Sequence, residues 1–223
     1  MDSLLDDAIA HHQRGALDEA ELGYQRLLQA NPDMVDALRL LATLYWQRSQ
    51  HVEARRHLEH ALMLAPDQAE LHLLMGNLHF SEEHYSEAIA AFKRATQRDD
   101  QLWRAHSHLG LALHARGEFA AAILSHRAAI KREPGIGELW YNLGLSLQES
   151  ENTPGAKAAY QMALTLLPGD TDTLNNLGNI ALSNGQTEEA IARYEEALAR
   201  SPKQPILLHN LGSALRQRQE HSA

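Results

Sequence analysis

The amino-acid sequence predicts an all-α protein built as a solenoid, an array of repeated helix pairs. A three-residue pattern ending in Leu-Gly recurs every 34 residues, and repeats of about 20–50 residues are typical of solenoids and arrays. Apolar residues within each repeat recur at helical spacing. Alanine and leucine dominate the composition while aromatic residues make up only 5%, a balance that favours helix.

The recurring pattern sets the register of the whole chain. It occurs as Asn142-Leu143-Gly144, Asn176-Leu177-Gly178, Asn210-Leu211-Gly212, His108-Leu109-Gly110, Leu74-Met75-Gly76, Leu40-Leu41-Ala42 and, weakly, Asp6-Asp7-Ala8. No insertion or deletion interrupts the 34-residue spacing. The sequence therefore divides into six full repeats, 1–34, 35–68, 69–102, 103–136, 137–170 and 171–204, and a partial seventh, 205–223.

Each full repeat is expected to contain two helices and the partial repeat one, about 13 helices in all. Proline ends five of the six full repeats, and it disfavours helix at the residue before it. These prolines are Pro32, Pro66, Pro134, Pro168 and Pro202, and Asp100, a capping carboxylate, takes the remaining place. Breaks within the repeats are expected near Gly15, Ser49-Gln50, Ser81-Glu82, Gly117, Glu151-Asn152 and Gly185.

The two ends of the array are expected to be more polar than its middle. Asp7 stands where the other repeats have leucine or methionine, so the first helix is expected to be a frayed, polar cap. The last helix is expected over residues 205–218, with Leu208, Leu211 and Leu215 facing back onto the sixth repeat. Its polar end suits a terminal cap; the alternative is that the natural chain continues.

Small residues at fixed positions predict close contacts between helices. Glycine or alanine ends the recurring pattern, and alanine stands at Ala20, Ala54, Ala88, Ala122, Ala156 and Ala190. A glycine inside a helix costs about 1 kcal/mol relative to alanine. Its repetition therefore predicts helices that pack at the short end of interhelical distances.

The fifth repeat shows the full pattern, with Trp140, Leu143, Gly144, Ala156, Tyr160, Ala163 and Pro168 in order. This pattern resembles the tetratricopeptide repeat, and the resemblance covers essentially the whole chain. It implies antiparallel helix pairs that stack into a right-handed superhelix. The first helix of each pair would line the concave side and the second helix the convex side.

Composition and charge limit the classes of partner. The formal net charge of −9 disfavours nucleic acid and anionic membranes. The chain has no cysteine, which excludes disulfides, thiolate catalysis and cysteine-ligated zinc. It contains neither a signal peptide nor an apolar run approaching the roughly 18 residues of a membrane span. We therefore expect a soluble, cytoplasmic protein that does not insert into membranes.

The sequence predicts no enzyme, no cofactor and no metal site. Glycines are spread one per repeat rather than gathered in a phosphate-binding loop, and no catalytic signature appears. The 14 histidines are interpreted as surface or packing residues. Two of them, His72 and His106, occupy the position of Trp140 and are expected to pack between helices.

The first position of the recurring pattern is the first candidate binding site. In the superhelical arrays of O-GlcNAc transferases, asparagines at this position form a ladder that binds the backbone of an extended peptide. The resemblance implies a short ladder of Asn142, Asn176 and Asn210, extended by His108 and bordered by Asn179 and Tyr141. An amide offers both a donor and an acceptor, so it can bind a peptide group of any sequence. The alternative is that these asparagines only solvate an exposed face.

The N-terminal half offers a second candidate site. Leu40, Trp46, Leu73, Leu74 and Phe80 are expected to form an exposed apolar patch beside Arg39, Thr43 and Asn77. Exposed apolar clusters with a polar rim mark interaction sites. Trp46 and Phe80 would then anchor a side chain of the partner. The alternative is that the superhelix covers this patch.

The predicted function is a non-catalytic scaffold that binds a protein or an extended peptide in its concave groove. One alternative is that the chain is the N-terminal, substrate-recruiting array of a larger enzyme, such as a glycosyltransferase or a hydroxylase. Another alternative is a scaffold that associates with copies of itself.

Overall fold

The computed structural model describes the backbone of residues 2–222 and the side chains of residues 3–220. Within this range the chain forms thirteen α-helices and no strand, which confirms the predicted fold class. The helices are α1 (Asp2–Gln13), α2 (Leu17–Ala30), α3 (Val35–Gln47), α4 (His51–Leu64), α5 (Ala69–Ser81), α6 (Tyr85–Arg98), α7 (Trp103–Ala115), α8 (Phe119–Arg132), α9 (Gly137–Glu149), α10 (Thr153–Leu166), α11 (Thr171–Ser183), α12 (Thr187–Arg200) and α13 (Pro205–Ser222).

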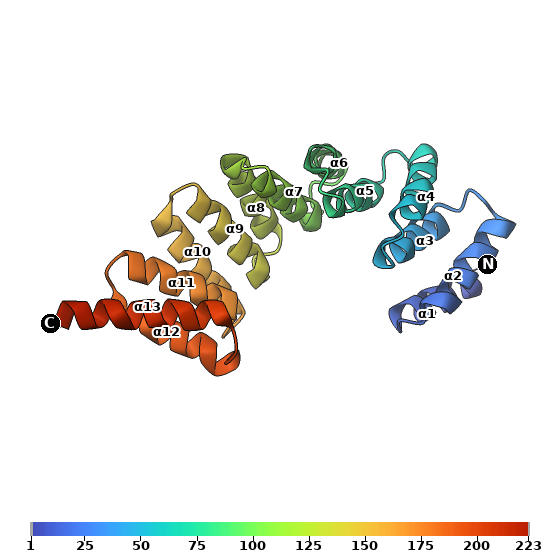
Figure 1. Cartoon of the computed structure of the whole chain (residues 1–223). Helices are drawn as coiled ribbons and strands as arrows, with labels where there is room; N and C mark the ends of the chain where they lie inside the picture. The colour runs from blue at the N-terminus through green and yellow to red at the C-terminus, as the bar shows by residue number, and fades with distance from the viewer. Residues whose placement is uncertain (1, 223) are drawn as a thin grey trace. The chain divides into compact units, whose positions relative to one another are not determined.

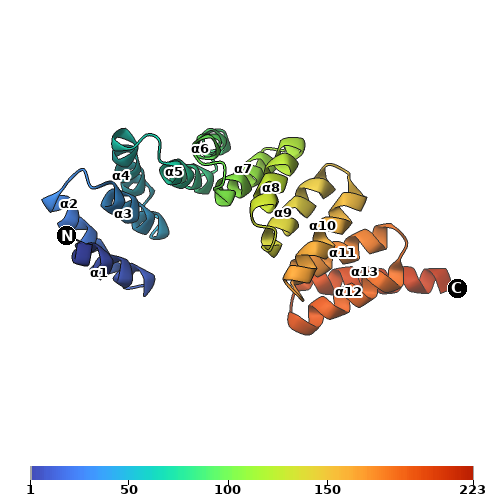
Figure 2. The same ribbon diagram turned by 180° about the vertical axis from the view of Figure 1, so that it is seen from behind.

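The helices divide between two compact units, Met1–Arg116 and Gly117–Ala223. The N-terminal unit holds α1 to α7 and the C-terminal unit holds α8 to α13. Figure 1 colours the first unit from blue to green and the second from green to red, and Figure 2 shows both from behind. The division falls between the two helices of the fourth repeat.

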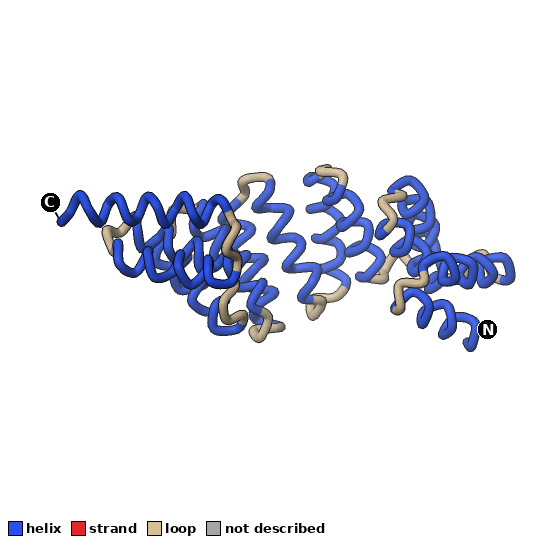
Figure 3. Tube along the Cα trace, turned by 60° about the horizontal axis from the view of Figure 1, so that its bottom comes forward, coloured by secondary structure: helices blue, strands red, loops and turns tan. Residues whose placement is uncertain are grey.

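Within each unit, consecutive helices pack as pairs joined by short loops (Figure 3). First helices of successive pairs also contact one another: α3 contacts α5, α5 contacts α7, and α11 contacts α13. No two successive second helices come into comparable contact among the described residues. First helices therefore lie on the inner side of each unit, and second helices lie on its outer side.

Left-handed residues close the turns within the repeats. Positive φ angles occur at Gly15, Ser49, Glu83, Gly117, Glu151 and Gly185. Glycine adopts this conformation without penalty, whereas other residues pay about 1–2 kcal/mol. The predicted breaks hold except in the third repeat, where the turn comes later because Ser81 is still helical and Glu83 has a φ of 61°. All five repeat-ending prolines stand two residues after the end of a helix.

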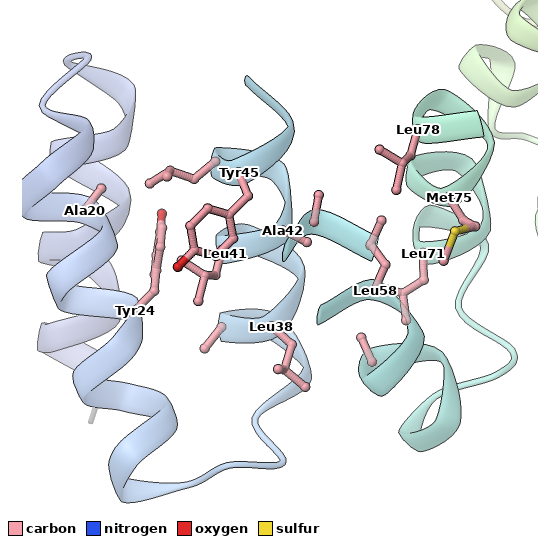
Figure 4. Close-up of a cluster of buried hydrophobic side chains, with 14 of the residues drawn as sticks. Ala20, Tyr24, Leu38, Leu41, Ala42, Tyr45, Leu58, Leu71, Met75 and Leu78 are labelled. Atoms are coloured by element: carbon pink, nitrogen blue, oxygen red, sulfur yellow. The ribbon is translucent and has the colours of Figure 1, made fainter. Parts of the chain in front are cut away.

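The core of the N-terminal unit joins side chains from neighbouring repeats (Figure 4). Tyr24 from α2, Leu41 from α3 and Leu71 from α5 are each at most 1% exposed. The six alanines that recur at one position along the chain are all fully buried. Their small side chains let neighbouring helices approach closely, as the sequence predicted.

Three glycines of the recurring pattern face an aromatic ring of the second helix of the same repeat. A Cβ atom added to Gly76, Gly144 or Gly178 would lie 2.4–2.5 Å from a ring carbon of Phe92, Tyr160 or Tyr194, respectively. These three aromatic side chains are at most 1% exposed, so they have little room to move. Close helix contact therefore explains why glycine stands at this position.

Three side chains at another repeat position each contact a backbone carbonyl six residues earlier. Trp140 Nε1 donates to the carbonyl of Pro134 at 2.9 Å. His72 Nε2 lies 2.8 Å from the carbonyl oxygen of Pro66, and His106 Nε2 lies 3.1 Å from that of Asp100. His72 and His106 therefore take the place of the tryptophan, and one ring nitrogen of each has a backbone carbonyl as its hydrogen-bond partner.

The ends of the array differ in part from the prediction. Helix α1 is continuous over Asp2–Gln13 although Asp7 is exposed, and α13 extends to Ser222 rather than ending near residue 218. The prediction that Leu208 faces the sixth repeat is wrong, because Leu208 is 52% exposed and Leu207 is buried instead. Leu211 and Leu215 pack against the core as predicted.

Candidate functional site

An aromatic pocket opens in the N-terminal unit. Its cavity of about 210 Å³ is lined by Trp46, Asn77, Phe80, Ser81, Phe92, His108 and Leu111. These side chains come from α3, α5, α6 and α7, so three successive first helices contribute to the pocket. Trp46 and Phe80 occupy equivalent positions in the second and third repeats, and the contact between α3 and α5 brings them together.

Phe92 and His108 form the part of the pocket between α6 and α7. The Phe92 ring is 1% exposed, and its centroid lies 5.7 Å from that of His108 in an edge-to-face arrangement. Gly76 leaves the room that this ring occupies. Phe92 therefore both fills the core and lines the pocket.

His108 is held in one orientation by Asn77. Its Nδ1 lies 2.6 Å from Oδ1 of Asn77, and because this oxygen only accepts, Nδ1 carries the proton and Nε2 remains an acceptor. Burial lowers the pKa of His108 below its usual value of 6.5, and the nearby Arg104 lowers it further. The imidazole is therefore neutral at pH 7 and adds a polar group without charge.

The rim of the pocket is fixed by contacts among its own residues. Trp46 Nε1 donates to Oγ of Ser81 at 3.4 Å, and Ser81 Oγ donates to the carbonyl of Leu78 at 2.8 Å. The ring of Phe80 packs edge-to-face against that of Tyr85, with centroids 5.5 Å apart. A pocket whose walls are already held needs little ordering when a ligand binds.

The remaining patch residues lie differently from the prediction. Leu40 and Leu74 are half-buried and pack against the core. The prediction of an exposed Leu73 is wrong, because this side chain is 2% exposed. Ser107, at the same position of the next repeat, is 4% exposed, so this position points into the protein in both repeats.

In the C-terminal unit, Asn210 joins two asparagines of the preceding repeat. Its Nδ2 donates to Oδ1 of Asn175 at 2.8 Å and to Oδ1 of Asn179 at 3.2 Å. The Tyr194 hydroxyl donates to the same oxygen of Asn179 at 2.8 Å. The amide of Asn210 is therefore engaged between repeats. Sequence reasoning missed Asn175, although its place beside Asn176 in an Asn-Asn pair was a usable signal.

Asn176 lies among the phenols of the fifth repeat. The rings of Tyr141 and Tyr160 lie 5.9 Å apart, Asn176 is near both hydroxyls, and the Tyr160 hydroxyl donates to Oε1 of Gln148 at 3.3 Å. Burial is the main cause that raises the pKa of each phenol, and the nearby amide of Asn176 lowers it in part. Both side chains are therefore neutral at pH 7.

Asn142 differs from the other two asparagines of the recurring pattern. Within the described residues of the C-terminal unit, its side chain has no hydrogen-bond partner, and it is half-buried. Within this unit its amide therefore keeps both its donor and its acceptor open. The expected ladder thus contains one amide, that of Asn210, bound to the preceding repeat and one, that of Asn142, open within its own unit.

The candidate residues fall into two groups. Trp46, Phe80 and His108 belong to the N-terminal unit, where the aromatic pocket unites them. The C-terminal unit contains Tyr141, Asn142, Asn176, Asn179 and Asn210.

Among the helices that the structure describes, none is both long and apolar enough to cross a lipid bilayer.

Comparison with family models identifies the repeat. Two models, both described as tetratricopeptide repeat, match the chain, one over residues 135–203 and the other over residues 11–78 and 46–109. Together these matches cover more than half of the sequence. A comparison with curated proteins found no significant match.

Solved structures with the same fold cover nearly the whole chain. A structure of PilF from Pseudomonas aeruginosa has a TM-score of 0.85 and 16% identity, and covers 95% of this chain and 96% of its own. PilW, described as a widely conserved type IV pilus biogenesis factor, has a TM-score of 0.84 and 18% identity, with 94% and 97% covered. YrrB, described as having an unusual peptide-binding site, has a TM-score of 0.71 and 19% identity, with 83% and 96% covered. At these identities the similarity shows the fold, an all-α solenoid of helix pairs.

Proposed function

Because the chain belongs to the tetratricopeptide repeat family, whose repeats serve as protein-interaction scaffolds, we propose that it is a non-catalytic scaffold that binds an extended peptide. An apolar side chain of the peptide enters the aromatic pocket between Trp46 and Phe80. The aromatic pocket is the observation that supports this proposal most directly. YrrB, which has the same fold, is described as having a peptide-binding site, and this is in line with the proposal.

The pocket suits one large apolar side chain. Its cavity of about 210 Å³ can hold a leucine, methionine or phenylalanine side chain, and its walls are mostly aromatic. Full burial of such a side chain is worth about 1.5–3 kcal/mol. Because Trp46 and Ser81 already hold each other, little of this free energy is lost in ordering the pocket.

The polar groups of the pocket favour a partner that donates a hydrogen bond. Nε2 of His108 is an acceptor once Nδ1 donates to Asn77. A backbone N–H of the peptide, next to the anchored side chain, is the commonest donor available. The pocket thus provides an apolar site for a side chain and an acceptor beside it.

Asn142 provides a second, separate surface in the C-terminal unit. Its open amide can donate to one peptide carbonyl and accept from one peptide N–H. Neighbouring Tyr141 adds an aromatic side to this surface. We propose that Asn142 binds peptide backbone there, whereas Asn176 and Asn210 act mainly by joining repeats.

A selection from a phage-displayed library of random linear peptides tests the proposal. We expect the selected peptides to share one large apolar residue, and their affinity to fall about tenfold or more in Trp46→Ala or Phe80→Ala. Met63→Ala is the matched control, because Met63 is a large apolar side chain that is 76% exposed and lies outside the pocket. Peptides that bind the Trp46→Ala protein as tightly as the wild type would refute the role of the pocket.

A further inference from the structure

We propose that the N-terminal unit also binds a transition-metal dication of the zinc class, through a His-Glu cluster of His79, Glu82 and His84. One ring nitrogen of each histidine and one carboxylate oxygen all lie within 4.8 Å of one another. Among the residues that the structure describes, this is the only group of three such side chains at that spacing. The site is separate from the aromatic pocket, which contains none of these residues.

The turn between α5 and α6 brings the three side chains together. His79 lies in the last turn of α5, Glu82 is the C-cap residue directly after this helix, and His84 immediately precedes α6. Glu83 adopts a φ of 61°, and the N–H of His84 donates to the carbonyl of His79 at 2.9 Å. The chain therefore reverses so that the two imidazole rings lie 6.3 Å apart, centroid to centroid.

His79 has an unused nitrogen. Its Nδ1 is buried and has no hydrogen-bond partner among the described residues. A buried polar atom without a partner is costly and is rare in folded proteins. Coordination of a cation by this nitrogen would give it a partner. This observation is independent of the spacing of the cluster.

The ligand types select the class of metal. Two imidazoles and a carboxylate suit Zn²⁺, Ni²⁺ or Cu²⁺, whereas Mg²⁺ and Ca²⁺ prefer ligands that are all oxygen. Zinc holds nitrogen and oxygen ligands at about 2.0–2.2 Å, so the three atoms must draw closer on binding. The His84 side chain is 58% exposed, and its movement can supply this closure.

The neighbours of Glu82 set the strength of the site. The guanidinium of Arg55 binds Oε2 of Glu82, while His51 Nδ1 lies 3.7 Å from Oε1. Nδ1 of His84 lies 3.4 Å from the same Oε2, so Arg55 and the metal would share this carboxylate, with His51 beside its other oxygen. Arg55 orients the carboxylate, as second-shell groups do, but its positive charge opposes a cation. Replacing Arg55 with glutamine keeps a hydrogen-bond donor and removes this charge.

Titration of the full chain with Co²⁺, followed by competition with Zn²⁺, tests the proposal. Co²⁺ bound in a site of this kind gives visible absorption, and Zn²⁺ displaces it. We expect one equivalent to bind, and we expect His84→Asn to weaken binding roughly tenfold or more, as loss of a ligand should cost at least as much as loss of an outer partner. Asparagine is a favoured residue before a helix, so this variant keeps the start of α6. Arg55→Gln should bind the metal more tightly than the wild type.

His60→Asn is the matched control. His60 also contacts a carboxylate, at 3.1 Å from Asp33, but among the residues that the structure describes these two are not part of a group of three ligands at this spacing. This variant should bind Co²⁺ as the wild type does, and circular dichroism should show that all variants keep their helix content. The proposal is overturned if the wild type binds no stoichiometric Co²⁺ or Zn²⁺, if His84→Asn binds unchanged, or if His60→Asn loses as much affinity.

Discussion

Two glycines at the same repeat position should respond in opposite directions to one substitution. A Cβ atom at Gly178 would lie 2.5 Å from Cε1 of Tyr194 and 2.9 Å from its Cδ1 and Cζ. The same atom at Gly212, in the next repeat, would meet nothing within 4 Å. We predict that Gly178→Ala destabilises the protein and that Gly212→Ala stabilises it.

The magnitudes follow from the surroundings of Tyr194. This side chain is fully buried, and its hydroxyl donates to Oδ1 of Asn179 at 2.8 Å, so its ring cannot move without strain. Overpacking costs about 1–3 kcal/mol and loss of the hydrogen bond about 1 kcal/mol, against a gain of about 1 kcal/mol in helix propensity. The net loss for Gly178→Ala is about 2 kcal/mol. Gly212→Ala has only the gain in helix propensity and should stabilise the protein by up to about 1 kcal/mol.

Urea unfolding followed by circular dichroism measures both variants against the wild type. The midpoint should fall for Gly178→Ala and rise for Gly212→Ala, with unchanged slopes. The two variants are a matched pair because both replace a glycine with alanine at the same repeat position of a first helix. If Gly178→Ala raises the midpoint as Gly212→Ala does, the reasoning is wrong and Tyr194 is not locked against the first helix.

Four further outcomes are expected. Trp140→Phe removes the 2.9 Å bond to a backbone carbonyl and should lower the free energy of unfolding by about 1 kcal/mol, measured by urea unfolding. Asn210→Ala removes two hydrogen bonds donated by the side-chain amide and should lower the free energy of unfolding by about 1 kcal/mol. Asn142→Ala should change the free energy of unfolding by less than about 0.5 kcal/mol. Burial raises the pKa of Tyr194 from 10.0 to about 12, so this phenol stays protonated to higher pH in the folded state than in the unfolded state. The free energy of unfolding should therefore fall as pH rises from 10 towards 12. Absorbance of tyrosinate should show a phenol that ionises near pH 12 in the folded protein and near pH 10 after unfolding. Burial and Arg104 lower the pKa of His108, so the stability of the folded state should fall as pH falls below 6.5. Thermal melts at several pH values should show that His108→Asn is less sensitive to acid than the wild type.

The helical framework was predictable because its signals are local. The 34-residue period, the prolines and the turn residues lie close together in sequence and determine where each helix begins and ends. The late turn in the third repeat is the exception: Ser81 and Glu82 are polar residues that a turn accepts, and only the observed φ of Glu83 shows where the chain reverses.

The candidate site was predictable in part. The repeat position of Trp46 and Phe80 was enough to expect two neighbouring aromatic side chains on first helices. Their union with Phe92 and His108 in one pocket depends on how three helices approach one another. Leu73 and Leu208 show the same limit, because neighbouring residues on a helix point about 100° apart and a one-residue error exchanges a buried face for an exposed one.

The sequence by itself thus determined the class of fold and the number of helices, and it indicated the close helix contacts at Gly76, Gly144 and Gly178. Only the tertiary structure decided the use of each polar group. Asn142, Asn176 and Asn210 are identical in local sequence pattern, yet the amide of Asn210 binds two asparagines of the preceding repeat, that of Asn176 is near two phenols, and that of Asn142 is open within its unit. His79 and His84 likewise belong to no sequence motif that predicted a site. The physical reason is that a hydrogen bond or a metal site needs partners within about 3 Å, and those partners come from other helices or from across a turn.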